Sequence, residues 1–201
     1  MIKNKNSFAI KDIFDQDEID LLIKISQKTD DVKNQGENFF AYTNGFSYNF
    51  LPSTIRKKIT NQIGSHQPTV CMILKEHVPW PIHSDYSGKN DRNKPTWAIL
   101  IPLDYSTDTH TVIFAEKEMQ NLSNYKNNNK VKNHTFSEKE LDLLSHIKKE
   151  DLQYVSDPIF YQWKIGSLIC WQRNLLHCSD NFTTNKNDYK IALVAFFCED
   201  D

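Results

Sequence analysis

The sequence has no stretch that is both long enough and apolar enough to cross a membrane. Its longest apolar runs, WAILIPL and IALVAFFC, are well short of the roughly 18 residues that a spanning helix needs. The N-terminus, MIKNKNSFAIKDIF, lacks the apolar region and the small-residue cleavage site of a signal peptide. We therefore expect a cytoplasmic protein that does not bind membranes.

A strong charge of either sign and closely spaced cysteines are also missing. The net charge of -2 excludes a general attraction to nucleic acid or to anionic membranes. A basic stripe with interleaved aromatics is absent, which disfavours a nucleobase substrate. Cys71, Cys170, Cys178 and Cys198 form no C-x-x-C pair, so neither a zinc knuckle nor a disulfide framework is indicated. We expect these cysteines to be small core residues.

The composition is that of a globular protein with one core. The chain has 201 residues, of which 39% are hydrophobic and 25% charged. We expect a single domain over residues 1–201, and no internal repeat is apparent.

Two amphipathic helices are predicted near the N-terminus. Asp15 is followed by Glu18 and then by apolar residues at helical spacing, which is typical of a capping box. The segment 52–63 places Ile55, Ile59 and Ile63 on one helical face. Residues 1–67 are therefore expected to form a helical support for the rest of the chain.

Strand patterns dominate after Pro68. The segments 69–77, 96–105, 110–116, 167–172 and 189–198 are short, apolar and separated by polar turns, which favours an antiparallel sandwich or barrel. We expect residues 68–116 and 158–198 to form this core. Residues 117–157 read as an insertion, composed of a mobile asparagine-rich loop and one helix that starts at the Ser137 to Glu140 capping box.

His83 and Asp85 stand two residues apart where the first of these strands runs out. On an extended chain such a pair projects to one side, so imidazole and carboxylate can converge. An H-x-D pair alone is weak evidence, because chance or a surface turn explains it as well. His177 follows the strand that begins after Gly166, and in a barrel the ends of distant strands meet. Two histidines and one carboxylate are the ligand set of non-haem Fe(II) sites.

The chain resembles the Fe(II)/2-oxoglutarate-dependent oxygenases over roughly residues 69–198. The resemblance is carried by the helices, a strand ending in H-x-D, a histidine after a G-S-L-I strand, and a basic residue opening the last strand. It implies a mainly β fold with flanking helices and a double-stranded β-helix core, also called a jelly roll or cupin-like barrel. It also implies that His83, Asp85 and His177 bind Fe(II), and that Lys190 pairs with the distal carboxylate of 2-oxoglutarate.

The activity implied by the resemblance is a dioxygenase reaction. With 2-oxoglutarate and O₂, such an enzyme hydroxylates an unactivated C–H bond, here of a small molecule or of a peptidyl residue. The sequence leaves the substrate and the oligomeric state open.

Two departures keep other readings open. The family usually has arginine where Lys190 stands, and lysine cannot form a bidentate pair with a carboxylate. A glycine-glycine step that many members carry is absent from STDTHTVIF. Arg173 is a competing anchor for the carboxylate. A cupin-like metalloprotein that does not use 2-oxoglutarate, and a binding module that has lost catalysis, are the alternative functions.

Other residues near these motifs have predicted roles outside the metal site. His110 is expected to be an exposed strand residue and Cys178 a packing residue. Trp80, Tyr86 and Trp97 flank the H-x-D pair and either line a substrate pocket or belong to the core. The insertion 117–157 is expected to form a lid over the metal, with a solvated excursion on the far side as the alternative.

Overall fold

The computed structural model describes residues 6–28, 32–34, 41–43, 47–85, 95–117, 122–132, 134–183, 185 and 187–198. Within these residues the helices are α1 (Gln16–Lys28), α2 (Ser53–Ile63), α3 (Leu122–Asn128), α4 (Glu138–Leu143) and α5 (Lys149–Leu152), with a short 3-10 helix η1 (Tyr48–Phe50). The strands are β1 (Ser7–Ile10), β2 (Val32–Asn34), β3 (Ala41–Thr43), β4 (Gln67–Glu76), β5 (Pro95–Tyr105), β6 (His110–Lys117), β7 (Ile159–Gln162), β8 (Leu168–Gln172), β9 (Leu175–Ser179) and β10 (Lys190–Cys198).

The strands form two antiparallel sheets. The larger sheet has seven strands in the order β1-β8-β5-β10-β4-β3-β2, and the smaller has three in the order β7-β6-β9. The predicted mainly β fold with flanking helices is confirmed. The N-terminal region adds strands β1, β2 and β3 to the larger sheet besides the expected helices.

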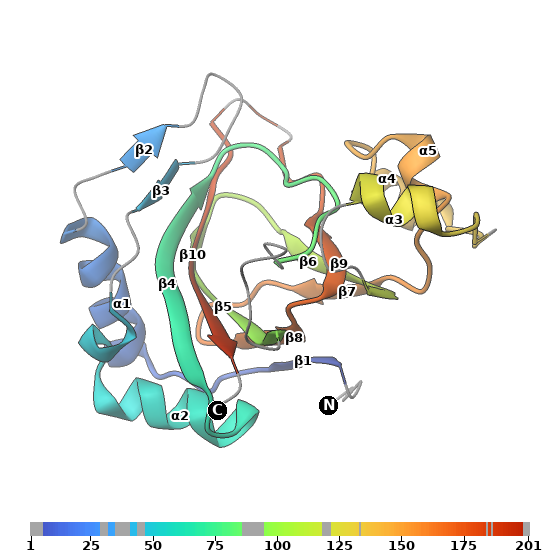
Figure 1. The fold of residues 1–201 in the computed structure, drawn as a ribbon. Coiled ribbons are helices and arrows are strands. Elements are labelled where there is room, and N and C mark those ends of the chain that lie inside the picture. Colours follow the sequence, from blue (N-terminus) through green and yellow to red (C-terminus); the bar gives the residue numbers. More distant parts are fainter. Residues whose placement is uncertain are drawn as a thin grey trace.

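The outer face of the larger sheet packs against the N-terminal helices (Figure 1). The predicted capping box is present, because Asp15 and Glu18 each accept a hydrogen bond from the other's backbone N–H, at 3.0 and 3.1 Å. Ile55 and Ile59 of α2 are fully buried in this core, as their spacing predicted. Because side chains alternate along a strand, this face takes every second residue of β4, β5, β8 and β10.

The remaining alternate residues of the larger sheet face the smaller sheet. Ala98, Leu100 and Val194 of the larger sheet pack with Ile113 of β6 and Leu175 of β9 in one apolar cluster. The two sheets therefore close around an interior, and the candidate site described below adjoins it.

The segment between β6 and β7 differs from the expected loop and single helix. Its described residues contain three short helices, and the capping box at Ser137 begins α4, which ends at Leu143. α3 forms within the asparagine-rich stretch because Tyr125 is buried, at 5% exposure, in a cluster with Leu144 and Val155. Tertiary burial here outweighs the low helix propensity of asparagine.

These three helices lie on the side of the molecule opposite α1 and α2 (Figure 1). Their cluster includes Val112 and Phe114 of β6 and Leu176 and Cys178 of β9, which point away from the interior. The smaller sheet is therefore buried on both faces. None of the helices in the described part of the chain has the length and hydrophobicity of a membrane-spanning helix.

Candidate metal centre

His83 and His177 are joined through their backbones in both directions. The N–H of His83 donates to the carbonyl of His177 at 2.9 Å, and the N–H of His177 donates to the carbonyl of His83 at 2.8 Å. His83 lies beyond the end of β4, in a segment that crosses to the smaller sheet, whereas His177 lies within β9. This reciprocal pairing fixes two imidazoles side by side, with ring centroids 4.2 Å apart.

Asp85 is held beside the two histidines by the turn between β8 and β9. Its N–H donates to the carbonyl of Arg173 at 3.0 Å, and Nη2 of Arg173 donates to the carbonyl of Asp85 at 2.8 Å. The indole Nε1 of Trp171 donates to Oδ2 of Asp85 at 3.0 Å. Backbone and carboxylate are thus both positioned by residues of the larger sheet and its following turn.

Backbone carbonyls determine which ring nitrogen of each histidine carries the proton. Nδ1 of His83 lies 2.8 Å from the carbonyl of Pro81, and Nδ1 of His177 lies 2.9 Å from the carbonyl of Leu175. A carbonyl can only accept, so each Nδ1 carries a proton and each neutral ring presents the lone pair of Nε2. Hydrogen bonds from the ring nitrogen that does not face the metal orient histidine ligands in metal sites.

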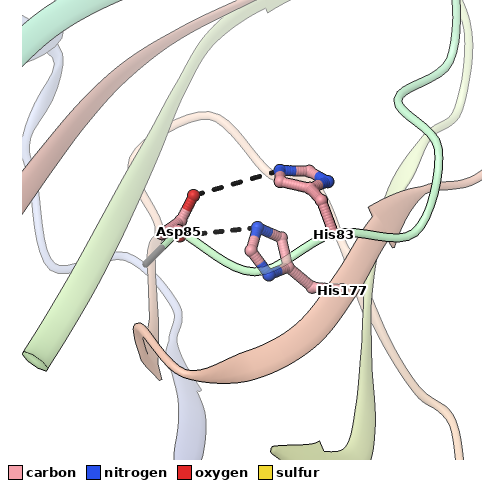
Figure 2. Close-up of side chains that lie close together, drawn as sticks. All are labelled: His83, Asp85 and His177. Atoms are coloured by element: carbon pink, nitrogen blue, oxygen red, sulfur yellow. Dashed lines mark ion pairs between the residues drawn. The ribbon is translucent and has the colours of Figure 1, made fainter. Parts of the chain in front are cut away.

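The two Nε2 atoms face the carboxylate of Asp85 (Figure 2). Nε2 of His177 is 3.4 Å from Oδ2, and Nε2 of His83 is 3.9 Å from Oδ1. One ligand atom from each residue lies within 4.8 Å of the others. The structure therefore brings together the three side chains that the sequence analysis singled out.

The charges in this cluster act differently on its three side chains. Burial and the neighbouring charge of His177 lower the pKa of His83 to about 4, so this ring is neutral near pH 7. Burial opposes ionisation of Asp85, but the charges of His177 and His83 and the Trp171 hydrogen bond outweigh it and lower its pKa. Burial likewise opposes protonation of His177, but the charge of Asp85 prevails and raises its pKa.

A cavity of about 350 Å³ adjoins the three residues and runs along the interior face of the larger sheet. Its walls are mainly apolar and include Leu74, Leu100 and Val194. Lys190, the first residue of β10, lies in the same cavity and is 1% exposed. Cavities that are mostly apolar with a few polar groups are typical of small-molecule sites.

Lys190 has an internal partner that the sequence analysis did not identify. Its Nζ is 3.0 Å from Oε2 of Glu76 and donates to Oγ of Ser179 at 2.8 Å. Glu76 is adjacent because Lys190 pairs with it in the register of β4 and β10. A signal was present in the sequence: Glu76 continues the alternation of Met72 and Leu74, so it falls on an apolar-facing position.

Trp171 was the other residue missed. It occupies an interior position on β8, two residues from Ile169, and its indole reaches Asp85. Strand alternation alone predicts the face on which Trp171 lies, but its hydrogen bond depends on how the H-x-D segment crosses the sheet.

The remaining candidates are placed as follows. Arg173 is buried and binds the backbone of Asp85, with its guanidinium over the ring of Phe196. His110, expected to be exposed, is partly buried and its Nδ1 lies 2.8 Å from Oδ2 of the buried Asp180. Cys178 packs in the cluster under the insertion, as predicted.

Of the three flanking aromatics, Trp80 lines the cavity. Trp97 packs on the outer face against Phe8, with ring centroids 5.5 Å apart, and so belongs to the core. Tyr86 lies outside the described residues.

The donor set suits a divalent transition metal. Two imidazole nitrogens and one carboxylate, with further positions left for small ligands, are the pattern of non-haem Fe(II) sites. The ordered Nδ1 bonds and the hydrogen-bonded carboxylate add the support that such a site requires. The residues present therefore fit a metal ion.

Family models and curated protein sequences give no match to the chain. Solved structures do. The non-haem α-ketoglutarate-dependent carbocyclase SnoK from nogalamycin biosynthesis matches with a TM-score of 0.64 at 12% identity, covering 98% of this chain and 80% of SnoK. The epimerase SnoN, in complex with Fe³⁺, α-ketoglutarate and nogalamycin RO, matches with a TM-score of 0.61 at 9% identity, covering 96% of this chain and 79% of SnoN.

A viral enzyme shares the same fold over nearly its whole length. The collagen prolyl hydroxylase of Paramecium bursaria Chlorella virus-1, in its 2-oxoglutarate complex, has a TM-score of 0.55 at 14% identity, covering 98% of this chain and 97% of the hydroxylase. The predicted double-stranded β-helix is thus confirmed as the fold.

Proposed function

We propose that this protein is an Fe(II)- and 2-oxoglutarate-dependent oxygenase that hydroxylates a C–H bond of a small molecule or of a peptidyl residue. One observation carries the proposal: Nε2 of His83, the carboxylate of Asp85 and Nε2 of His177 converge beside an apolar cavity that also contains Lys190. The shared fold with oxygenases that bind iron and 2-oxoglutarate supports it.

Each residue has a defined part in this proposal. His83, Asp85 and His177 would hold the Fe(II), which would supply the binding place for the keto acid and O₂. The ammonium of Lys190 attracts the distal carboxylate of 2-oxoglutarate. Arg173 is the less suitable anchor because its guanidinium is engaged with the backbone of Asp85.

The protein's own contribution to the reaction is orientation and exclusion of water. Bound iron with 2-oxoglutarate and O₂ supplies the oxidising power for the C–H bond. Leu74, Leu100 and Val194 keep the neighbourhood of that chemistry dry. Trp80 lies on the wall nearest the H-x-D segment, where its ring can contact a substrate.

Anaerobic titration with Fe(II), with and without 2-oxoglutarate, tests the proposal. We expect one Fe(II) per chain and a weak visible charge-transfer band that appears only when metal and 2-oxoglutarate are both present. Succinate formation under O₂ is the second readout. Failure to bind Fe(II) in the intact, folded protein contradicts the proposal.

A metalloprotein that does not use 2-oxoglutarate is the second candidate. The observation that favours it is the ion pair between Lys190 and Glu76, which already neutralises the cation proposed as the anchor. This candidate predicts Fe(II) binding without the 2-oxoglutarate band and without succinate.

A further inference from the structure

The cation proposed to receive the cosubstrate is already part of a closed polar triangle. Lys190 contacts Oε2 of Glu76 at 3.0 Å and donates to Ser179, whose hydroxyl lies 3.3 Å from the same Oε2. The side chains of Lys190 and Glu76 are only 2% and 5% exposed. The charge of Lys190 is therefore balanced by the protein itself before any ligand arrives.

The surroundings of the ammonium show why a counter-ion is needed. Nζ lies 4.6 Å from the ring centroid of Trp163 and 4.7 Å from that of Phe182. Aromatic faces attract a cation but do not replace its water, so a buried lysine without an acid would be strongly destabilised. Glu76 offsets this cost.

Glu76 faces the same cavity as the metal-site residues. A ligand carboxylate that approaches Lys190 must therefore come close to a second carboxylate, and like charges in a dry site repel strongly. Thr111 is a neutral donor in this cavity: its Oγ1 accepts from Nε1 of Trp163 at 2.9 Å, so its own hydroxyl proton can be given to a ligand.

We propose that Glu76 determines cosubstrate specificity by making this end of the cavity charge-compensated. The end of the cavity formed by Lys190, Glu76 and Ser179 then accepts a 2-oxo acid with a neutral hydrogen-bonding end nearly as well as one with a distal carboxylate. The inference rests on the proposed function, because it concerns the group that Lys190 would receive. Specificity here arises from a repulsive element as well as an attractive one.

The test compares two ligands that differ in charge at the distal end. The probes are 2-oxoglutarate and its 5-methyl ester, which keeps the carbonyl acceptor but loses the charge. 2-Oxopentanoate, which lacks the distal polar group, reports binding of the keto acid end alone. Dissociation constants are measured by calorimetry on anaerobic protein loaded with Mn(II), and by the visible band with Fe(II).

In Glu76→Gln we expect the preference for 2-oxoglutarate over the ester to rise by about tenfold or more. Lys190 is then no longer neutralised by Glu76, so its charge is free to pair with the distal carboxylate of 2-oxoglutarate. 2-Oxopentanoate binding should stay unchanged. The matched control is Glu116→Gln on β6, which removes another buried carboxylate, one that accepts a hydrogen bond from Ser156. An unchanged or smaller preference in Glu76→Gln overturns the inference.

The double variant Glu76→Gln with Lys190→Met keeps the proposal testable if Glu76→Gln does not fold. It removes both charges together, which buried ion pairs tolerate better than the loss of one partner. We expect its ligand preference to stay within about threefold of the wild-type value, since the intact pair is already neutral. A tenfold or greater loss of preference would show that Lys190 acts as an uncompensated anchor and would overturn the inference.

The same measurements distinguish failure of the proposed function from failure of the inference about Glu76. If none of the three keto acids binds to metal-loaded protein, the proposed function is wrong and this inference falls with it. If 2-oxoglutarate binds and the preferences do not respond to Glu76, only the inference is wrong.

Discussion

The indole of Trp171 and the carboxylate of Asp85 are joined by a hydrogen bond of 3.0 Å from Nε1 to Oδ2. The bond links a strand of the larger sheet to a side chain beyond the end of β4, and it fixes the direction in which the carboxylate faces the two histidines. Its removal should therefore affect metal binding while leaving the ligands themselves in place.

Trp171→Phe should weaken Fe(II) or Mn(II) binding by about ten- to hundredfold, the usual effect of losing a hydrogen bond that orients a metal ligand. The phenyl ring keeps most of the packing, so the thermal midpoint should change little. Calorimetric metal titration measures the affinity. Trp97→Phe on the outer face is the control, and equal affinities in the two variants would show that the indole bond has no role in the site.

His83→Ala and His177→Ala should each lower metal affinity by more than about a hundredfold, since a ligand is lost as well as its support. Both should stay folded, because the bridge between these residues is formed by backbone atoms that alanine retains. Metal content after dialysis and circular dichroism provide the readouts. The exposed His77→Ala is the control, and full metal content in both cluster variants would contradict the triad.

Lys190→Met should weaken 2-oxoglutarate binding by about 1.5 to 3 kcal/mol, because it removes the ammonium that the ligand contacts and leaves the carboxylate of Glu76 facing the ligand. Arg173→Ala should instead disturb Asp85, whose backbone it binds, and so reduce metal affinity. Calorimetry with each ligand separates the two effects, and the exposed Lys164→Ala serves as control. The anchor would be Arg173 if that variant alone loses 2-oxoglutarate.

The insertion 117–157 should respond to ligands mainly near His146, whose Nε2 lies 3.2 Å from the carbonyl of Trp80. We expect hydrogen exchange at residues 143–147 to slow when metal and 2-oxoglutarate bind, since this part contacts the segment that leads to His83. α5 should be unaffected and serves as the internal reference. Protection that rises around Trp97 instead would mean that the lid lies elsewhere.

The four cysteines should resist thiol reagents in the folded protein. All four are buried, and burial raises the pKa of Cys71 to about 12 and that of Cys170 well above its usual value. The reactive thiolate of these two residues is therefore scarce at pH 8, and burial shields the other two from the reagent. We expect less than one thiol per chain to react with a chromogenic disulfide reagent before unfolding, and four after it; rapid reaction of the native protein would contradict this.

Features encoded by neighbouring residues could be predicted from the sequence. The caps at Asp15 and Ser137 join residues three apart, and both are present. The long strands β4, β5 and β10 carry enough alternating apolar residues to be recognised. The four-residue strands β1 and β7 do not, because strands of this length gain their stability from the sheet that they join.

Features encoded by distant residues could be predicted only in part. His83, Asp85 and His177 were identified through a ligand pattern with a known chemistry. Glu76 carries no such ligand pattern: the alternation along β4 places it on the apolar face, but only its pairing with Lys190 in the sheet supplies the partner that lets a carboxylate be buried there. Tyr125 is similar, because the residues that bury it come from another part of the chain.

The reciprocal backbone bridge between His83 and His177 also bears on how fast a metal ion can enter. Two residues 94 positions apart are already aligned by hydrogen bonds that belong to the folded chain, so the loop-closure entropy is lost during folding. The capture of an ion then requires little further ordering of the protein. Its rate should instead depend on how readily the ion sheds its water, which makes a slowly dehydrating ion such as Mg²⁺ a poor competitor in time as well as in affinity.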